Sequence, residues 1–369
     1  MGLSALLISN GFQPNYEKAF ANGLAANAIA VTLITSERSL VNDLAPSVQP
    51  LGIRGSQDSK RTRWQKSTNL LRYARDLVTH IRKNSYDVVH LTGMFMTRNV
   101  FAGVLEWMLY RLICRRFVMT VHNILPHGRH GLWYRLNYHL VYRLAHLLVV
   151  HTEKMRTELI NDFGIRPDRI VVMAHGVDEV PQALSVPPNS THLRVLLFGG
   201  LNPYKGVDQF LRAAAICTDL PMRIVIAGET RDAEYAALIN QLVAAVPAVH
   251  EVEWHRGFIQ EERVKDYFEA ADVVVLPYRH IDQSGVLFTA FRFGTPLIAT
   301  DVGSFREGLP DFAGLLARSA EPGDIASAIH EFSARRDAFD RDRIRAHAKS
   351  LSWPNCVRPL VAAYQRLCH

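Results

Sequence analysis

Short runs of apolar, often β-branched residues alternate along the chain with longer segments in which apolar residues recur every three or four positions. The short runs predict strands buried on both faces of a parallel sheet, and the longer segments predict helices that cover it. In the first half we expect strands at residues 3–9, 30–35, 87–91, 117–121, 146–150 and 170–173, and helices at residues 15–27, 70–84, 98–114, 133–144 and 153–163. This alternation predicts a doubly wound α/β sheet.

The same pattern restarts in the second half, after a proline-rich segment at residues 180–192 that is typical of an interdomain linker. Here we expect strands at residues 193–198, 223–227, 252–258, 272–277, 297–300 and 314–316, and helices at residues 233–245, 261–270, 285–293 and 324–332. Residues 353–367 predict one amphipathic helix, and residues 43–63 predict a polar, mobile loop. We therefore expect two similar α/β domains, at residues 1–180 and 193–350, facing one another across a cleft.

The composition is that of a globular protein with two real cores: 369 residues, 48% hydrophobic and 21% charged. The net charge of +7 and the pI near 9.3 favour an anionic partner, such as a nucleotide or an anionic membrane. The four cysteines have no metal-binding spacing, so we expect reduced thiols, no metal and a cytoplasmic protein. No apolar run is long enough to span a bilayer, and the apolar start at residues 3–8 is too short for a signal peptide.

Residues 271–307 form the stretch around which the chain is organised: strand, polar loop, helix, strand and a second loop. The first amides of the helix at residues 285–293 have no partner within the helix, so they predict an anion site at the carboxyl edge of the sheet. Ser284 would either cap this helix or donate its hydroxyl to a diphosphate. Asp282 would bind sugar hydroxyls or be a plain surface carboxylate.

A second candidate is the loop after the strand at residues 193–198, which contains Gly199, Gly200 and Lys205. Adjacent glycines let the backbone approach a ligand closely, and a lysine near the start of a helix adds a positive charge. The pattern is typical of phosphate binding, although it matches neither the P-loop nor the GxGxxG motif. The alternative is an ordinary turn with a solvated lysine.

A third candidate follows the strand at residues 117–121, where His122 and Asn123 precede His127 and His130. Side chains at the carboxyl end of a parallel strand line the ligand crevice, so His122 would contact a polar ligand unless it is a structural histidine. The irregular spacing argues against zinc.

Two helices combine basic and aromatic residues, which suits the headgroup layer of an anionic membrane. The alternative is a pair of core helices with solvated arginines. The residues concerned are Arg98, Trp107, Met108, Leu109, Tyr110, Arg111, Arg115 and Arg116, and Arg129, Trp133, Tyr134, Arg135, Tyr138, Tyr142 and Arg143.

Taken together, these motifs resemble the family 4 glycosyltransferases, which have the GT-B fold of two facing Rossmann-like domains. The resemblance covers nearly the whole chain. It rests on residues 198–206, on Ala174-His175-Gly176-Val177-Asp178, on Gly294-Thr295-Pro296 through Gly303 to Glu307, on His122-Asn123, and on the segment from Ser352, which would cross back onto the first domain.

The resemblance implies a retaining, metal-independent hexosyltransferase that uses a UDP- or GDP-linked sugar and no cofactor. Lys205 would neutralise the diphosphate, and Gly199, Gly200, Gly285 and Glu307 would help to bind the donor. His122 would contact the donor sugar. Gly11 would lie by the diphosphate, and Asn15 and Asn123 by the acceptor.

Three departures from the family pattern are visible in the sequence. Gly200 replaces an arginine, Ile281 and Thr289 stand where the family has paired glutamates, and Gly11 stands where it has two glycines. We therefore interpret the chain as a divergent subgroup in which Asp282, Gln283 and Ser284 take over donor contacts.

The resulting hypothesis is a glycosyltransferase, peripheral to the cytoplasmic face of the inner membrane, that extends a lipid-linked glycan in surface polysaccharide assembly. The alternatives are a non-catalytic nucleotide-sugar-binding subunit of a glycan-assembly complex and a sugar-nucleotide epimerase of the same fold. Nucleic-acid binding is disfavoured because the positive charge follows no known module.

Overall fold

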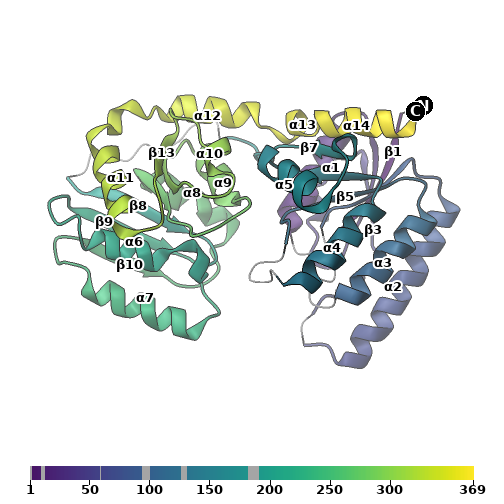
Figure 1. Ribbon diagram of the computed structural model, residues 1–369, viewed down its shortest axis with the longest axis horizontal. Coiled ribbons are helices and arrows are strands. Elements are labelled where there is room, and N and C mark those ends of the chain that lie inside the picture. Colours follow the sequence, from purple (N-terminus) through teal and green to yellow (C-terminus); the bar gives the residue numbers. More distant parts are fainter. Residues whose placement is uncertain (1, 10–12, 59, 94–99, 126–130, 182–190) are drawn as a thin grey trace. The chain divides into compact units, whose positions relative to one another are not determined.

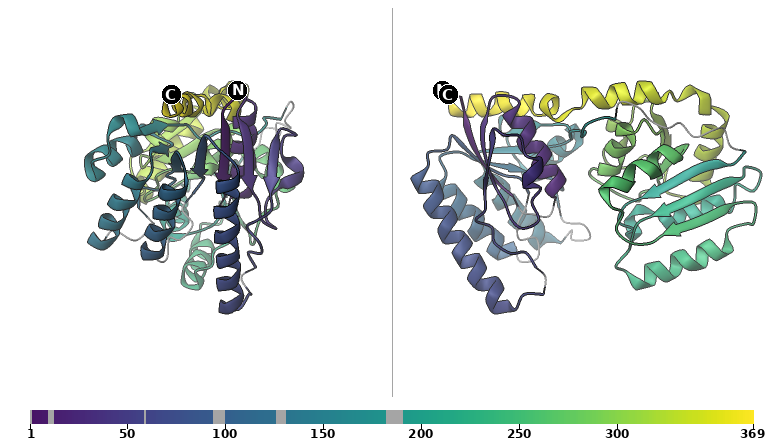
Figure 2. Two further views of the ribbon diagram at one scale, coloured as in Figure 1. Left: turned by 90° about the vertical axis from the view of Figure 1, so that its right-hand side faces the viewer. Right: turned by 180° about the vertical axis from the view of Figure 1, so that it is seen from behind.

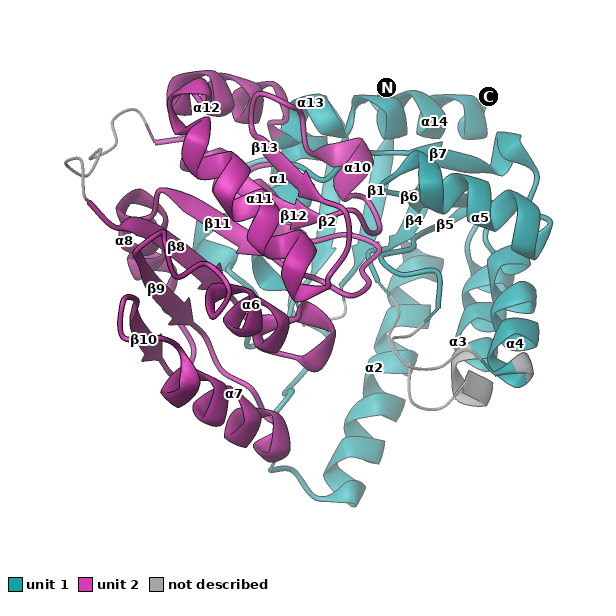
Figure 3. Ribbon diagram, turned by 60° about the vertical axis from the view of Figure 1, so that its left-hand side comes forward, with its two compact units in different colours: residues 1–176, 353–369 teal, residues 177–352 magenta. Residues whose placement is uncertain are grey.

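The computed structural model describes residues 2–9, 13–58, 60–93, 100–125, 131–181 and 191–369. It divides the chain into two compact units (Figure 3): unit 1 comprises Met1–Gly176 with Trp353–His369, and unit 2 comprises Val177–Ser352. Each unit is built on one parallel sheet with helices on both faces. The predicted α/β fold class is therefore confirmed. The predicted linker lies largely outside the described residues.

Unit 1 contains a seven-stranded sheet in the order β3-β2-β1-β4-β5-β6-β7. Its strands are β1 (Ser4–Ile8), β2 (Ala30–Ile34), β3 (Val48–Leu51), β4 (Val88–Leu91), β5 (Phe117–Thr120), β6 (Leu147–Val150) and β7 (Ile170–Val172). Side chains alternate between the faces, so Leu6 and Ile8 lie in one core while Ala5 and Leu7 lie in the other. Because both faces are buried, these strands are apolar throughout.

One face of this sheet is covered by α2 (Arg63–Lys83), α3 (Val100–Ile113), α4 (Leu132–Leu144) and α5 (Glu153–Phe163). The other face is covered by α1 (Pro14–Ala25) and by the C-terminal helices α13 (Trp353–Cys356) and α14 (Arg358–Cys368). The yellow C-terminal segment lies against the purple start of the chain in Figures 1 and 2, and Trp353 packs edge-on against the Tyr16 ring at 5.1 Å. Short 3₁₀ turns occur at Val41–Asp43 and Pro167–Arg169.

Three predictions for unit 1 were wrong. The predicted loop at residues 43–63 contains strand β3, which pairs with β2 at the sheet edge. Helix α2 begins seven residues earlier than expected, because Thr62 and Gln65 form a capping box that satisfies its first amides. The C-terminal segment is two helices, α13 and α14, which are separated at Val357.

Unit 2 contains a six-stranded sheet in the order β10-β9-β8-β11-β12-β13. Its strands are β8 (Leu193–Phe198), β9 (Met222–Ala227), β10 (Glu251–His255), β11 (Val273–Leu276), β12 (Leu297–Thr300) and β13 (Gly314–Ala317). Helices α6 (Val207–Ala214), α7 (Ala233–Ala245) and α11 (Pro322–Ala334) cover one face. Helices α8 (Glu261–Ala270), α9 (Gly285–Arg292), α10 (Phe305–Gly308) and α12 (Arg341–Ser350) cover the other, and 3₁₀ turns occur at Pro203–Lys205 and Arg336–Ala338.

The strand order identifies where a ligand would bind in each unit. In unit 2 the first strand along the chain, β8, lies beside β11, and the chain proceeds outward from this pair in both directions. The loops that leave the carboxyl ends of β8 and β11 therefore diverge and leave a crevice, which is the usual ligand site of such sheets. In unit 1 the corresponding neighbours are β1 and β4.

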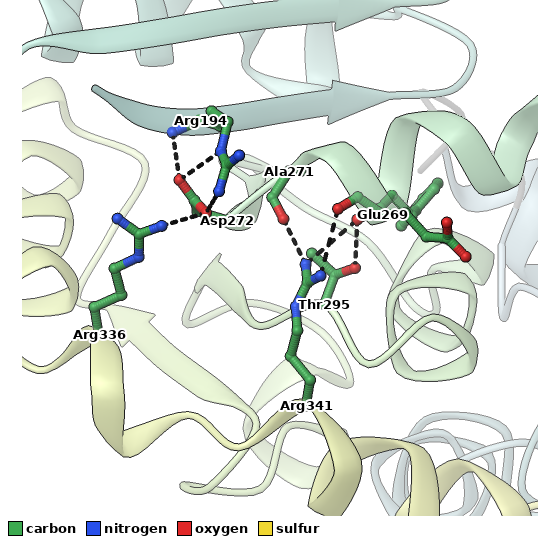
Figure 4. A network of polar contacts seen from close by, with 8 residues as sticks. Arg194, Glu269, Ala271, Asp272, Thr295, Arg336 and Arg341 are labelled. Carbon is green, nitrogen blue, oxygen red and sulfur yellow. Dashed lines mark hydrogen bonds and ion pairs between the residues drawn. The ribbon is translucent and has the colours of Figure 1, made fainter. Parts of the chain in front are cut away.

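At the opposite, amino edge of the unit 2 sheet, a buried carboxylate ties several elements together (Figure 4). Asp272, just before β11, accepts hydrogen bonds from the Arg194 guanidinium at 2.6 and 3.1 Å and from the Arg194 backbone amide at 2.9 Å. Arg336 also donates to it, while Arg341 donates to the Ala271 carbonyl oxygen. The side chain of Asp272 is only 6% exposed, so this carboxylate is a buried ion-pair centre.

The aromatic residues expected at a membrane surface are mostly core residues. Trp107 and Tyr110 of α3, and Tyr138 and Tyr142 of α4, are buried, so the alternative reading of these four was right, while Trp133 is exposed. Arg98 and Arg129 lie outside the described residues. All four cysteines are free thiols, as predicted. Within the described residues, every helix is too short or too polar to cross a membrane.

Candidate functional site

The crevice of unit 2 begins with two glycine turns that bring backbone close to backbone. Gly199 follows β8 with a φ of +101°, and Gly228 follows β9 with a φ of +149°. A Cβ atom at Gly228 would lie 2.0 Å from the Gly199 carbonyl oxygen, so no other residue fits there without a shift of the chain. The Gly199 and Gly228 amides donate to the Ala227 and His255 carbonyl oxygens, so the turns leave a surface without side chains at the carboxyl end of β8, where Gly200 is exposed.

Lys205 ends the 3₁₀ turn above this surface. Its ammonium nitrogen lies 5.5 Å from the centre of the Tyr278 ring and would be 3.3 Å from a Cβ atom at Gly199. Burial lowers the pKa of Lys205 to about 8, because a desolvated ammonium is destabilised. Among the described residues, no carboxylate forms an ion pair with it. An anion bound beside Gly199 would supply the missing negative charge.

The Lys205 turn is held in place by Arg279, which the sequence analysis did not identify. The Arg279 amide donates to the Tyr204 carbonyl oxygen at 2.7 Å, and its guanidinium pairs with Asp208 at 2.6 and 3.0 Å. Although burial alone would raise the pKa of Asp208, the hydrogen bonds from Arg279 and Tyr235 hold it below its usual range. The arginine follows β11 and the aspartate lies in α6, so this pair fixes the two loops of the crevice to each other.

The amino end of helix α9 forms another wall of the same crevice. Ser284 occupies the cap position, but its side chain makes no cap bond, so the capping interpretation was wrong. Its hydroxyl lies instead 3.3 Å from the Tyr278 hydroxyl. A Cβ atom at Gly199 would lie 3.6 Å from Val286 of α9, and the position of a Cβ at Gly285 is open. The structure thus brings Gly199, Lys205 and the first turn of α9 together.

The remaining predicted donor residues lie around this wall. Asp282 and Gln283 are half-buried in the loop before α9, and Glu307 is exposed on α10. This loop approaches the β12 side closely, since a Cβ atom at Gly303 would lie 1.7 Å from the Ile281 carbonyl oxygen. The hydroxyl of Ser304 is buried and has no hydrogen-bond partner in the described part of the chain.

In unit 1, His122 lies at the carboxyl end of β5, as predicted, in direct contact with a second histidine. Its Nε2 lies 2.7 Å from the Thr92 carbonyl oxygen, and its Nδ1 lies 3.3 Å from Nε2 of His151. The Nδ1 atom of His151 lies 2.9 Å from the Met173 carbonyl oxygen. Sequence reasoning missed His151, although its position directly after β6 is the same signal that identified His122.

The two carbonyl contacts determine where the protons of this pair lie. A carbonyl oxygen only accepts, so His122 carries its proton on Nε2 and His151 carries its proton on Nδ1. Burial lowers the pKa of both rings, and for His151 the neighbouring His122 lowers it further, so both are neutral at pH 7. The Thr92 carbonyl oxygen thereby holds the His122 ring in one tautomer and one orientation, and no proton lies between the two facing nitrogens of the pair.

The other predicted residues of unit 1 are less enclosed. Asn123 is half-buried next to His122, and Asn15 is exposed in the first turn of α1. Gly11 lies outside the described residues, as do His127 and His130. The roles of His122, Asn123 and Asn15 remain predictions.

Acidification is expected to destabilise unit 1. Burial lowers the pKa of His90, in β4, to about 3 and that of His175 to about 4. Both rings take up a proton only on unfolding, so the free energy of unfolding falls as the pH drops below about 6.5, by about 1.4 kcal/mol per pH unit and histidine. Hydrogen exchange of the β4 amides at pH 7 and pH 5 measures this slope. In the variant His90→Gln the slope should be smaller by the contribution of one histidine. An unchanged slope would show that His90 does not cause the pH dependence.

Comparison with known proteins agrees with this two-unit architecture. A model described as Glycosyltransferase Family 4 matches residues 15–180, and a model described as Glycosyl transferases group 1 matches residues 192–334. A D-inositol 3-phosphate glycosyltransferase of Geodermatophilus obscurus is 30% identical over 240 residues, which are 60% of this chain and 52% of that protein. The chain thus spans about half the length of this curated relative.

Solved structures share the fold at low identity. Sucrose-phosphate synthase from Thermosynechococcus elongatus superposes with a TM-score of 0.76 at 17% identity, covering 100% of this chain and 99% of that one. HepE of Anabaena in complex with UDP superposes with a TM-score of 0.72 at 16% identity, covering 99% and 100%, and HepE has also been solved with UDP-glucose. At this identity the likeness shows the fold alone, which is of the GT-B type, and the two family models together account for both units. The chain therefore belongs to the family 4 glycosyltransferases.

Proposed function

We propose that the protein is a glycosyltransferase that moves a hexose from a nucleotide sugar to a glycan acceptor with retention of configuration. The observation that carries this proposal is Lys205: a half-buried ammonium beside the Gly199 turn and the first turn of α9. A cation and a helix amino end are groups that bind a diphosphate. HepE, which has been solved with UDP and UDP-glucose, supports a UDP-linked donor.

In this proposal the leaving group is the nucleoside diphosphate, and its departure is the step that unit 2 assists. The ammonium of Lys205 stabilises the negative charge that develops as the bond between sugar and phosphate breaks. Asp282, Gln283 and Ser284 contact the donor in place of the family's glutamates, since Ile281 is buried and the Thr289 hydroxyl bonds to the Gly285 carbonyl oxygen at 3.1 Å. The proposed reaction uses no metal and no cofactor.

The proposed role of His122 is to hold the donor sugar with a neutral imidazole of fixed orientation. The Thr92 carbonyl oxygen maintains that orientation. Asn15 and Asn123 are proposed to contact the acceptor. We propose a lipid-linked glycan of surface polysaccharide as this acceptor, and a cytoplasmic protein that lies peripherally on the inner membrane.

A screen of UDP- and GDP-sugars tests the donor. A sugar nucleotide at 100 times its Kd should stabilise the protein by about 2.7 kcal/mol, which thermal unfolding detects. The stabilising compound should also be consumed when acceptor glycans are added, with a glycoside as product. No stabilisation by any sugar nucleotide would contradict the proposal.

The missing glutamates favour one alternative specifically. If Ile281 and Thr289 leave the site able to bind but not to react, the protein is a nucleotide-sugar-binding subunit of a glycan-assembly complex. In that case the same screen gives stabilisation without consumption over a broad acceptor panel. Release of free nucleotide without a glycoside product would instead indicate an epimerase-type reaction.

A further inference from the structure

A cavity in unit 1 lies at the amino edge of the sheet, away from His122. It has a volume of about 460 Å³ and is lined by the carboxyl ends of α3 and α4, by the turn before β7 and by α14. Its charged lining consists of Arg111, Arg143, Arg166, Arg169, Arg366 and Asp168. We call these five arginines with Asp168 the arginine pocket. Nothing in the proposed transfer reaction uses it.

The charge of the arginine pocket is largely uncompensated. Five guanidinium groups and one carboxylate give it a net charge of +4, more than half of the +7 of the whole chain. Asp168 pairs with Arg166 at 3.0 Å, and Arg169 donates to the Arg143 carbonyl oxygen at 3.0 Å. Burial lowers the pKa of Arg169, and the neighbouring guanidinium of Arg166 lowers it further. Like charges held this close destabilise the free protein, and an anion would relieve their repulsion.

A histidine adds a directed donor to the same wall. The Phe117 amide donates to Nδ1 of His146 at 2.9 Å, so in the neutral ring the proton lies on Nε2. Burial, and then Arg111, lower the pKa of this ring. Guanidinium groups with a ring N–H are suited to the oxygens of a phosphate.

Helices α3 and α4, which lead to the pocket, carry an unusual second apolar face. Their inner faces bury Trp107 and Tyr142 in the core, while their outer faces expose large apolar side chains at i, i+3 and i+7. We call these the outer stripe: Leu105, Met108 and Leu112 on α3, and Trp133, Leu136 and Leu140 on α4. Leu112 is 82% exposed and Trp133 is 78% exposed. The two helices pack side by side (Figure 1), so the two rows adjoin.

The outer stripe runs into the arginine pocket. Arg143 follows Leu140 by three residues, and Arg111 follows Met108 by three and directly precedes Leu112, so each arginine borders the outer stripe of its helix. A soluble phosphate compound would use the pocket but leave the stripe in water. A lipid bilayer with anionic headgroups would satisfy both, since phosphate groups meet arginines while apolar side chains enter the boundary of the acyl chains.

We propose that the arginine pocket binds the phosphate groups of anionic lipid headgroups while the outer stripe of α3 and α4 inserts into the lipid surface. The inference rests on the proposed peripheral membrane location and specifies the surface that provides it. It is independent of donor chemistry, because lipid binding is measured without any transfer reaction.

Co-sedimentation of the full chain with vesicles tests the electrostatic part. The protein should bind vesicles of phosphatidylcholine with phosphatidylglycerol and not vesicles of phosphatidylcholine alone. The triple variant Arg111→Glu, Arg143→Glu, Arg366→Glu should bind at least about 100-fold more weakly, because each cation near an anionic surface contributes about fivefold. The matched control reverses three exposed cations on α2, α6 and α12: Lys83→Glu, Arg212→Glu and Lys349→Glu. In both triple variants the net charge falls from +7 to +1. The control should bind vesicles with an affinity within tenfold of that of the unmodified protein.

The apolar part is tested by Leu112→Gln with Trp133→Gln. Both side chains are exposed, so thermal unfolding should be unchanged while vesicle binding weakens about tenfold. Equal loss in the two charge-reversed variants would overturn the assignment of the surface. Binding of inorganic pyrophosphate that depends on the three arginines, without any vesicle binding, would make the pocket a soluble-anion site and overturn the lipid partner.

Discussion

Lys205→Ala is expected to lower kcat/KM for glycosyl transfer by about 10²- to 10³-fold, the usual effect of removing one preorganised group that stabilises a leaving group. Arg279, in the other loop of the crevice, is paired with Asp208, and Gly200 stands where the family has an arginine. We therefore expect binding of the diphosphate to depend on the Lys205 ammonium. Initial rates at several donor concentrations measure the effect, with thermal unfolding to verify the fold.

Two controls separate charge from packing. Lys205→Arg keeps the charge and should recover part of the lost activity, whereas Lys349→Ala, on the exposed end of α12, should have no effect. Equal activity of Lys205→Ala and the unmodified protein would show that the diphosphate role is wrong.

The pH dependence of nucleotide binding provides a second readout of the same residue. In the free protein Lys205 loses its proton near pH 8 because it is buried. A bound diphosphate favours the charged form, so binding includes uptake of a proton above pH 8, and the affinity for UDP or GDP should fall by up to about tenfold per pH unit. In Lys205→Ala this fall should disappear.

The periodicity of the sequence predicted the central elements well, because burial on both faces makes them apolar throughout. Helices α5 and α7 have the predicted bounds, as do strands β8 and β12. The missed strand β3 has the sequence Val-Gln-Pro-Leu and pairs with one neighbour only. An edge strand of this kind carries polar residues and proline, so no apolar run marks it.

Helix faces show a different limit of the sequence. Leu105 and Trp107 lie two positions apart in α3, and both are large and apolar, yet the first is exposed and the second is buried. Periodicity cannot assign the faces of a helix that is apolar on both. Tyr110, which one reading of the sequence placed at a membrane surface, is therefore a core residue. The outer stripe was recognised only from the packing of the helices.

The sequence could identify those residues of the candidate site that share one loop or directly follow a strand. Gly199, Lys205 and Ser284 come from two such loops, and the strand order of the sheet brings those loops together. Arg279 could not be predicted, because its role depends on Asp208, which lies 71 residues earlier in the chain. Contacts of this range arise from the tertiary fold and leave no local signal.

Asp272→Ala is expected to lower the free energy of unfolding of unit 2 by about 3–5 kcal/mol. Removing one partner of a buried ion pair leaves the other charge without compensation. Arg194 and Arg336, whose side chains are 17% and 30% exposed, would both lose their carboxylate (Figure 4). The substitution therefore weakens the contacts that connect β8, β11 and the turn before α12.

Hydrogen exchange of the β8 and β11 amides measures this loss, and the amides of β1 and β4 in unit 1 serve as an internal reference. Asp219→Ala is the matched control, because its carboxylate pairs with His330 at 3.5 Å on the surface and is 75% exposed. Such a pair contributes about 1 kcal/mol or less. Because Asp272 lies at the edge of the sheet opposite the Lys205 crevice, any Asp272→Ala protein that remains folded should still bind the nucleotide. A loss of binding without a loss of amide protection would show that the carboxylate acts on the site and not on the stability of the unit.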